Sequence, residues 1–222
     1  MSYLTSFMKK YPHWTMLLYW PIFGLLFYLA EKGKVGVIYY QMHCALDDKI
    51  PFCEWFLIPY LFWFVYMVGM HIYLFFKDGE QFNRLMLCII LTYSVGLIVF
   101  YLFPTYQNMR PTTFERDNIL TQIMAAFYQF DTCTNVCPSL HVVGSLSVTF
   151  AGLNCPSLKG RGWKLFFILS GCLISISTVF VKQHSLIDVA AGLVVAMGAY
   201  MIVYGSNVLS THPSPYIRYH SR

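Results

Sequence analysis

Charged side chains are scarce in this chain. Only 11% of its 222 residues are Asp, Glu, Lys or Arg, whereas 57% are hydrophobic and 18% are aromatic. Soluble globular domains carry roughly a quarter charged residues, so the composition excludes an ordinary soluble protein and predicts a membrane protein. The formal net charge is +5, yet no basic run is longer than Lys9-Lys10. Nucleic-acid binding is therefore not expected, because scattered Lys and Arg are usual in the cytoplasmic loops of membrane proteins.

Three further patterns are missing. The closest pair of the seven cysteines, Cys133 and Cys137, has no second pair at the spacing of a zinc site. A disulfide between these two cysteines, or between Cys44 and Cys53, can form outside the cytoplasm, but the odd number of cysteines favours unpaired thiols. No small-x-small cleavage site follows the first apolar run, which indicates a retained helix and not a signal peptide. Internal repeats and the alternating segments of a membrane barrel are also absent.

Long apolar runs are what the sequence does contain. A helix that crosses about 30 Å of hydrocarbon needs about 20 mostly apolar residues. Six runs bounded by charged or turn residues approach this requirement: Trp14–Ala30, Phe56–Phe76, Leu85–Phe103, Ser139–Leu153, Leu165–Val181 and Leu186–Tyr204. The fourth is short and rich in Ser and Gly, so we expect its neighbours to shield it from lipid. The pattern predicts an all-α, polytopic membrane protein with six transmembrane helices in one bundle, forming a single domain over residues 1–222.

The distribution of Lys and Arg predicts the orientation of this bundle. These residues are somewhat more numerous in the segments on the side of the amino terminus. Cytoplasmic loops carry such an excess, so both termini are predicted to be cytoplasmic. The long connection between the third and fourth runs then lies on the outer face, together with the start of the sixth run.

Ionisable side chains within the six runs are few, and each is expected to have a partner or a function. The short list is His71, His141, His184 and Asp188. His184 and Asp188 are one helical turn apart, so the carboxylate can accept a hydrogen bond from one imidazole nitrogen and leave the other basic. This suits a nucleophilic or general-base histidine; the alternative is a polar pair that only packs the sixth helix. His71 has no visible partner and is predicted to be a buried structural histidine.

Two other stretches carry groups that suit an anion. In "CPSLHVVGS", Pro138 favours the start of a helix. The backbone N–H groups of Ser139, Leu140 and His141, with the Ser139 hydroxyl, would form an anion pocket at its positive end. N-terminal capping is the alternative role for this stretch. In "NMRPTTFER", Arg110 can bind two phosphate oxygens at once, which a lysine cannot; the alternative is a solvated loop arginine.

Taken in order, "RP", "PSLH" and "S" followed by "HSLID" resemble a known family. The chain is similar to the type 2 phosphatidic acid phosphatase superfamily of lipid phosphatases and related transferases, whose pattern is KxxxxxxRP, PSGH and SRxxxxxHxxxD. The likeness covers Arg110 to Asp188 directly. Through the six-helix layout it extends to nearly the whole chain.

The resemblance implies roles for the residues that match. His184 would attack phosphorus and form a phosphohistidine, with Asp188 orienting it. His141 would protonate the leaving oxygen and then activate the incoming water or alcohol. The equatorial oxygens would be held by Arg110, by Ser139 and by the backbone donors around Leu140, where phosphoryl transfer most needs electrostatic stabilisation.

Three positions depart from the family pattern. Phe103, Leu140 and Thr178 stand where the family has Lys, Gly and Arg. Lys182, and with it Arg116, are nearby cations that compensate in one interpretation, with Lys182 binding the substrate phosphate. In the other interpretation Lys182 is an interfacial lysine that extends its ammonium to water. Variants with leucine in the second motif include phosphotransferases that make phosphosphingolipids, so a transferase is an alternative, as is a catalytically silent lipid-binding member.

The sequence thus predicts an integral membrane lipid-phosphate phosphatase, metal-independent and without a cofactor. Its site would face outward from a bacterial plasma membrane, with a lipid phosphomonoester or diphosphate as substrate and no nucleic acid as partner. A metal site made of His141, His184 and Asp188 is conceivable but brings too few oxygen ligands for magnesium. The head group, the chain length and the oligomeric state are not determined by the sequence.

Overall fold

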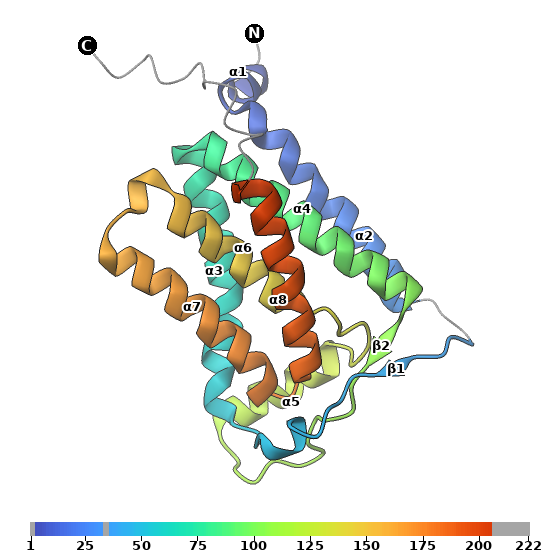
Figure 1. Cartoon of the computed structure of the whole chain (residues 1–222). Helices are drawn as coiled ribbons and strands as arrows, with labels where there is room; N and C mark the ends of the chain where they lie inside the picture. The colour runs from blue at the N-terminus through green and yellow to red at the C-terminus, as the bar shows by residue number, and fades with distance from the viewer. Residues whose placement is uncertain (1–2, 33–35, 206–222) are drawn as a thin grey trace.

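The computed structural model describes residues 3–32 and 36–205, and most of them are helical (Figure 1). The helices are α1 (Tyr3–Lys10), α2 (Tyr19–Lys32), α3 (Leu57–Lys77), α4 (Gly79–Leu102), α5 (Ile119–Phe130), α6 (Leu140–Asn154), α7 (Arg161–Phe180) and α8 (Leu186–Tyr200). Short 3-10 turns span Pro12–Leu18, Asp47–Lys49, Glu54–Phe56 and Pro156–Leu158, and a π turn, Met201–Gly205, extends α8. Two-residue strands β1 (Tyr40–Gln41) and β2 (Thr105–Tyr106) pair in parallel and join two loops. The prediction of a mostly helical protein is confirmed.

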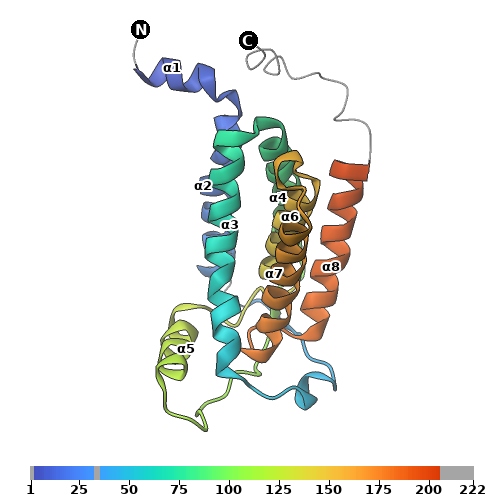
Figure 2. The ribbon, with the colours of Figure 1, turned by 90° about the vertical axis from the view of Figure 1, so that its left-hand side faces the viewer.

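The helices form an up-and-down bundle in which α2, α3, α4, α6, α7 and α8 alternate in direction (Figures 1 and 2). Each predicted apolar run coincides with one of them. Among the described residues, five helical segments are long and apolar enough to cross a membrane: Pro12–Lys32, Glu54–Lys77, Gly79–Leu102, Arg161–Phe180 and Leu186–Gly205. At 15 residues α6 does not reach that length. The count of six spans and the orientation therefore stay predictions, and the carboxyl terminus lies outside the described residues.

Helix α6 lies at the centre of the bundle and packs against α3, α4, α7 and α8. Its small residues make this possible, since a methyl group at Gly152 would lie 2.5 Å from the ring of Phe167. Its hydroxyls bond within the helix, as when Ser147 Oγ donates to the carbonyl of Val143 at 2.7 Å. These contacts explain how a short, Ser- and Gly-rich helix is stable here, shielded by its neighbours as expected.

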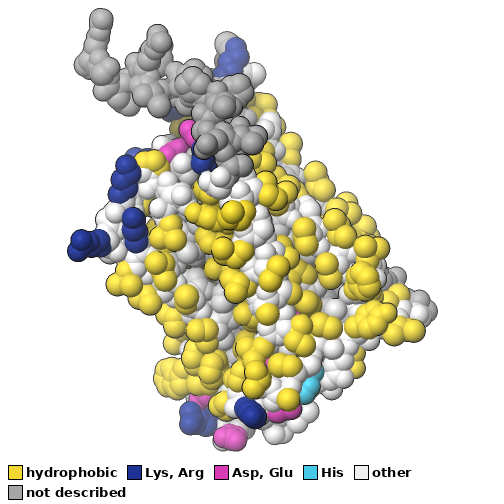
Figure 3. All heavy atoms as spheres, viewed as in Figure 1, with side chains coloured by type: hydrophobic (Ala, Val, Ile, Leu, Met, Phe, Trp, Pro, Cys, Tyr) yellow, Lys and Arg dark blue, Asp and Glu magenta, His cyan; other side chains and the backbone are white. Residues whose placement is uncertain are grey.

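The surface of the bundle is apolar around its middle. Figure 3 shows hydrophobic side chains over the centre of one face, with Lys, Arg, Asp and Glu gathered at its two ends. On α3, Ile58, Val65 and Ile72 are all exposed. Exposed apolar side chains along long apolar helices are expected in lipid and unfavourable in water. The chain is therefore an integral membrane protein.

The connection between α4 and α6 holds a helix, α5, that the sequence analysis did not predict. Asn118 caps its amino end, where its side chain accepts hydrogen bonds from the N–H groups of Leu120 and Thr121 at 3.0 and 3.1 Å. The Asn118 N–H in turn donates to Thr121 Oγ1 at 3.0 Å, which completes a capping box. This reciprocal capping starts α5 inside an otherwise irregular segment.

Candidate functional site

The turn between α7 and α8 sets the position of His184. Lys182 adopts the left-handed conformation, with a φ of 53°, at the place after a helix where glycine is usual. The Gln183 N–H then donates to the carbonyl of Thr178 at 2.9 Å, and the Lys182 N–H donates to the carbonyl of Val179 at 3.1 Å. This Schellman arrangement ends α7 and reverses the chain, so that His184 is presented just before α8.

Asp188 connects His184 to the amino end of α8. Ser185 is the N-cap, and its hydroxyl accepts a hydrogen bond from the Ile187 N–H at 3.1 Å. The Ser185 N–H donates to Asp188 Oδ2 at 2.9 Å, and the same oxygen lies 3.4 Å from His184 Nδ1. Asp188 is fully buried and His184 nearly so. The structure thus brings the predicted pair together, with Nδ1 facing the carboxylate and Nε2 left for chemistry.

Asp47, which the sequence analysis missed, binds this turn from the first long loop. Its Oδ2 accepts from the Ser185 hydroxyl at 2.6 Å, and its Oδ1 accepts from the Leu186 N–H at 2.9 Å. In the reverse direction, Lys182 Nζ donates to the carbonyls of Asp47 and Ile50 at 2.9 and 2.5 Å. Both charged residues are buried. We call these contacts of Asp47 and Lys182 the clamp. No local sequence pattern reveals it, because the residues that it joins are more than 130 positions apart in the sequence.

These contacts shift the pKa values of Asp47 and Lys182. Burial acts to raise the pKa of Asp47, but the hydrogen bonds from Ser185, Leu186 and Cys44 outweigh it and lower the pKa below its ordinary value. Burial lowers the pKa of the Lys182 ammonium, and Asp47 and Asp48 offset part of that effect. The structure therefore places the Lys182 ammonium on the loop carbonyls, and its role in phosphate binding stays a prediction.

The Asp47→Ala substitution is expected to lower the free energy of unfolding by about 2 kcal/mol, because it removes buried hydrogen bonds to a charged group. The pKa of Asp47 is lowered in the folded protein. Its stabilisation is therefore complete above the unfolded-state pKa of about 4 and is lost as the pH falls through the folded-state pKa. Thermal unfolding in detergent between pH 7 and pH 3 measures this. The matched control is Asp48→Ala, since the Asp48 side chain is exposed; equal midpoints for the two variants at neutral pH would contradict the assignment.

The start of α6 lies directly against the start of α8. Ser139 is the N-cap of α6, with its Oγ accepting from the Val142 N–H at 3.4 Å, and its own N–H donates to the carbonyl of Asp188 at 3.2 Å. The ring centroids of His141 and His184 are consequently 5.9 Å apart. The structure brings both predicted histidines together beside the start of α8, and this start lies at the end of the bundle opposite α1 (Figure 1).

Two aromatic residues of α3 form a wall behind His141. The ring of Tyr60 stacks on the imidazole with centroids 4.4 Å apart, and the ring of Trp63 lies at 4.5 Å. His141 Nε2 has no hydrogen-bond partner in the described part of the chain. The wall therefore fixes the imidazole by packing and leaves one nitrogen available. The sequence analysis missed both aromatic residues, because they lie inside an apolar run where nothing separates them from lipid-facing side chains.

Arg110 reaches the same turn through Gln183, another residue that the sequence analysis missed. Its Nη1 donates to the carbonyls of Tyr128 and Asp131 at 3.2 and 2.8 Å. Its Nη2 donates to the carbonyl of Thr132 at 2.7 Å and to Gln183 Oε1 at 2.5 Å. The guanidinium also lies 4.9 Å from the ring centroid of Tyr128. These contacts hold the Arg110 guanidinium against Gln183, the residue that directly precedes His184.

Four buried polar atoms around His184 have no hydrogen-bond partner among the residues that the structure describes: Arg110 Nε, Gln183 Nε2, His141 Nε2 and Asp188 Oδ1. Buried polar groups are almost always paired, and exceptions gather where a ligand or water binds. Three of the four can donate hydrogen bonds. The arrangement therefore suits a group with several acceptor oxygens, as an oxyanion has.

The comparison with protein families decides what class of protein this is. The family model described as the PAP2 superfamily matches residues 39–202, which include every element of the site. The chain belongs to the PAP2 superfamily. The predicted resemblance is thereby confirmed, and the chain is of the phosphatase and phosphotransferase class. A search of curated proteins found no match, and neither did a search of solved structures.

The departures from the PAP2 pattern have distinct surroundings. Phe103 is exposed at the end of α4. Thr178 is buried, and its hydroxyl donates to the carbonyl of Ser175 at 2.8 Å. Arg116, which could compensate for a missing cation, instead donates to Glu54 at 3.0 Å. Arg110 is therefore the arginine that this PAP2 protein brings to the histidines.

Leu140, at the glycine position of the second motif, is the first residue of α6, and its side chain packs against α4. Its carbonyl accepts a hydrogen bond from the Tyr93 hydroxyl at 3.3 Å. A methyl group at Gly96 would lie 3.1 Å from the Leu140 side chain, so the leucine packs closely against α4. The leucine is thus part of the packing between α4 and α6, and its backbone contribution to phosphate binding stays a prediction.

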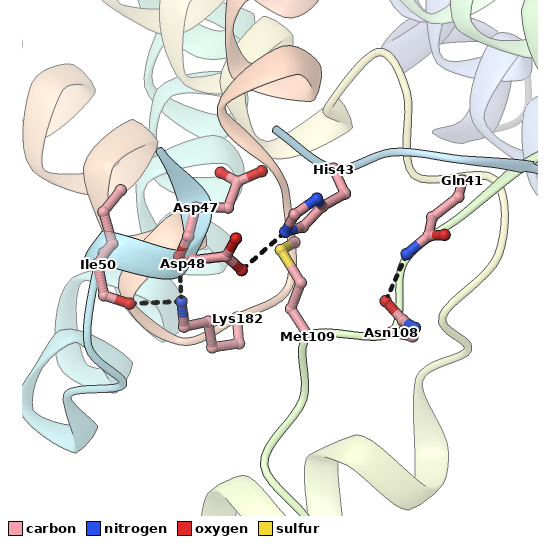
Figure 4. Close-up of a pocket in the computed structure, with 8 residues that line it drawn as sticks. All are labelled: Gln41, His43, Asp47, Asp48, Ile50, Asn108, Met109 and Lys182. Atoms are coloured by element: carbon pink, nitrogen blue, oxygen red, sulfur yellow. Dashed lines mark hydrogen bonds and ion pairs between the residues drawn. The ribbon is translucent and has the colours of Figure 1, made fainter. Parts of the chain in front are cut away.

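A polar pocket of about 530 Å³ lies beside the site (Figure 4). Its polar wall consists of Lys182 and Asp47, the pair His43 and Asp48 with 2.8 Å between Nε2 and Oδ1, and the pair Gln41 and Asn108, also at 2.8 Å. Neither His141 nor His184 is among the residues that line it. The two clamp residues, Asp47 and Lys182, therefore line this pocket on the loop side as well as holding the turn between α7 and α8.

Within residues 3–32 and 36–205, no group of three or more His, Cys, Asp or Glu side chains is arranged to hold a metal ion. All seven cysteines lie among the described residues and are unpaired there. His71 is half-buried and its Nδ1 lies 2.7 Å from the carbonyl of Met67, within its own helix.

Proposed function

We propose that this PAP2 protein is an integral membrane lipid-phosphate phosphatase that works through a phosphohistidine. The observation that carries the proposal is the convergence of His184, His141 and Arg110 at one end of the bundle. With Asp188 at Nδ1 of His184, the Nε2 atom is the available nucleophile. The unpaired donors around it supply the hydrogen bonds that a phosphoryl group needs.

The reaction would proceed in two displacements at phosphorus. In the first, His184 Nε2 attacks phosphorus and the bond between phosphorus and the lipid oxygen breaks, while His141 gives a proton to that oxygen. In the second, water gives a proton to His141 and attacks phosphorus, and the bond between phosphorus and nitrogen breaks to release phosphate. Asp188 stabilises the positive charge that His184 acquires.

The proposed substrate is a phosphomonoester or diphosphate on an amphiphile. The site lies at the end of a bundle whose sides are apolar (Figure 3). A lipid can place its phosphate there while its tails stay in hydrocarbon. Lys and Arg are in excess in the segments on the same side of the bundle as the amino terminus, which supports an outward-facing site at the opposite side. We propose the plasma membrane of a bacterium as the location.

A lipid phosphotransferase is the second candidate. Leu140 in the second motif favours it, as does the polar pocket beside the clamp, which can take the polar part of a donor or an acceptor alcohol. A silent lipid-binding member is the third candidate, favoured by Phe103 and Thr178 in place of family cations.

A panel of lipid phosphates tests the proposal. The purified protein in mixed micelles is expected to release inorganic phosphate from lipid phosphomonoesters or diphosphates, equally with and without a chelator. Adding a phospholipid donor and a lipid alcohol separates the second candidate, since a transferase forms a new phosphodiester and little free phosphate. Absence of any product, together with no labelled phosphate on His184, would refute both enzymes in favour of the silent member.

A further inference from the structure

Helix α5 has two apolar faces, and one of them is unpartnered. Its twelve residues, ILTQIMAAFYQF, include no charged side chain. The inner face carries the buried Met124. On the outer face Ile119, Ile123 and Phe130 are 67%, 40% and 88% exposed. These three follow helical spacing and form a stripe along the helix, which we call the α5 stripe.

The α5 stripe is exposed although both ends of the helix are firmly held. At the amino end, Glu54 accepts hydrogen bonds from Arg116 at 3.0 Å and from Asn118 Nδ2 at 3.2 Å. At the other end, the Tyr128 hydroxyl donates to the carbonyl of Val181 at 2.6 Å. Rotating the helix to bury the stripe would break these contacts. The outward position of the stripe is therefore built into the fold.

The surroundings of the stripe are those of a membrane boundary. Helix α5 packs against the 3-10 turn Glu54–Phe56, which leads into the membrane-spanning α3. Figure 2 shows it beside the end of α3, at the end of the bundle away from α1. Trp55 and Ile58, at the start of this span, are 60% and 56% exposed. The stripe thus lies next to apolar surface that meets lipid.

We propose that α5 is a bilayer-surface helix whose stripe, Ile119, Ile123 and Phe130, is buried in the leaflet beside the site. An amphipathic helix in the interface places its apolar face at the boundary between head groups and acyl chains. The charged residues that flank α5 are held off the stripe: Asp117 is exposed and accepts from Gln122 Nε2 at 2.9 Å, and Asp131 is paired with Arg110 at 3.5 Å. This location does not depend on the proposed function.

The inner face of α5 connects this surface to the histidines. The ring of Phe127 contacts Tyr60 edge to face, with centroids 5.4 Å apart, and Tyr60 stacks on His141. Tyr128 carries the guanidinium of Arg110 on its ring. Helix α5 therefore brings the leaflet next to the phosphate site. Its use in capturing a lipid phosphate rests on the proposed function.

Tryptophan quenching tests the location directly. The Phe130→Trp variant is reconstituted in nanodiscs with and without brominated phospholipid, and its fluorescence is compared with that of the wild type. The added indole is expected to be quenched. The control is Glu115→Trp, at an exposed position before α5, which should add no quenched fluorescence. Equal quenching of the two added indoles overturns the proposal, as does a dimer in nanodiscs that Phe130→Ser separates.

Kinetics test the use of the helix. Ile123→Asp is expected to raise KM for phosphatidic acid in phosphatidylcholine vesicles by roughly tenfold, because it removes apolar contact with the leaflet. Its kcat toward a water-soluble phosphomonoester should be unchanged. Gln122→Asp is the matched control on the same helix. An unchanged KM for the vesicle substrate would overturn the role in capture. If the wild type hydrolyses neither substrate, the proposed function fails while the quenching result still decides the location.

Discussion

The His184→Asn variant is expected to lose at least about 10⁴-fold in kcat, because removal of a nucleophile that acts in a concerted set abolishes most of the rate enhancement. The fold should survive. His184 is nearly buried, and its side-chain partner is Asp188 at 3.4 Å, to which the asparagine amide can still donate. The measurement is release of inorganic phosphate from the best lipid substrate, together with thermal unfolding in the same detergent.

A histidine elsewhere in the bundle is the control for this prediction. His71 lies in α3, with its Nδ1 near the carbonyl of Met67, and its ring contacts Trp20 and Phe82, which are not residues of the site. His71→Asn should keep activity within a few-fold of the wild type. Labelled phosphate should be trapped on the wild type and on His71→Asn but not on His184→Asn. Full activity of His184→Asn would rule out the proposed mechanism.

The Arg110→Lys variant is expected to lose roughly 10²- to 10³-fold in kcat/KM, the loss typical when one preorganised donor to a developing oxyanion is removed. The charge is kept, but the geometry is not. Arg110 uses both terminal nitrogens to reach the carbonyls around α5 and Gln183 Oε1, whereas a lysine has one ammonium and no fork. Steady-state kinetics on a lipid phosphate measure the loss.

Two comparisons separate binding of phosphate from folding. Arg116→Lys is the matched control, because Arg116 is largely exposed and contacts Glu54 away from the histidines; its kcat/KM should not change. Gln183→Leu removes both the Oε1 contact with Arg110 and the Nε2 donor. We expect a smaller loss in kcat/KM than in Arg110→Lys, together with a lower unfolding midpoint, because a buried hydrogen bond to a charged group is lost. Wild-type kcat/KM in Arg110→Lys would contradict a phosphate-binding role.

Local features of the chain were predictable because their causes are local. Helix positions follow from apolar runs and from capping residues close in sequence, so the six predicted runs agree with the observed helices to within a few residues at most ends. The start of α4 differs most from its prediction. It begins at Gly79, since Asp78 caps it by accepting from the Gln81 N–H at 3.1 Å, and the polar first turns hid this from a search for apolar residues.

The pairing of His184 with Asp188 was predictable for the same reason. A separation of four residues places both on one side of a helix start, whatever surrounds them. Ser139 and His141 likewise sit at a helix start that Pro138 signals. The short helix α5 was missed although its capping box of Asn118 and Thr121 is local, because twelve residues are fewer than the membrane-spanning runs from which the helices were predicted.

What the sequence determined by itself is the membrane class, the helical fold, the PAP2 family and the residues of its motifs, because these depend on composition and on spacing along the chain. What only the tertiary structure decided is how the site is supported. Asp47 reaches the start of α8, Gln183 receives Arg110, and Tyr60 and Trp63 hold His141. These contacts join segments that are distant in sequence, and hydrogen bonds and ring packing depend on position in space, which only the folded bundle provides.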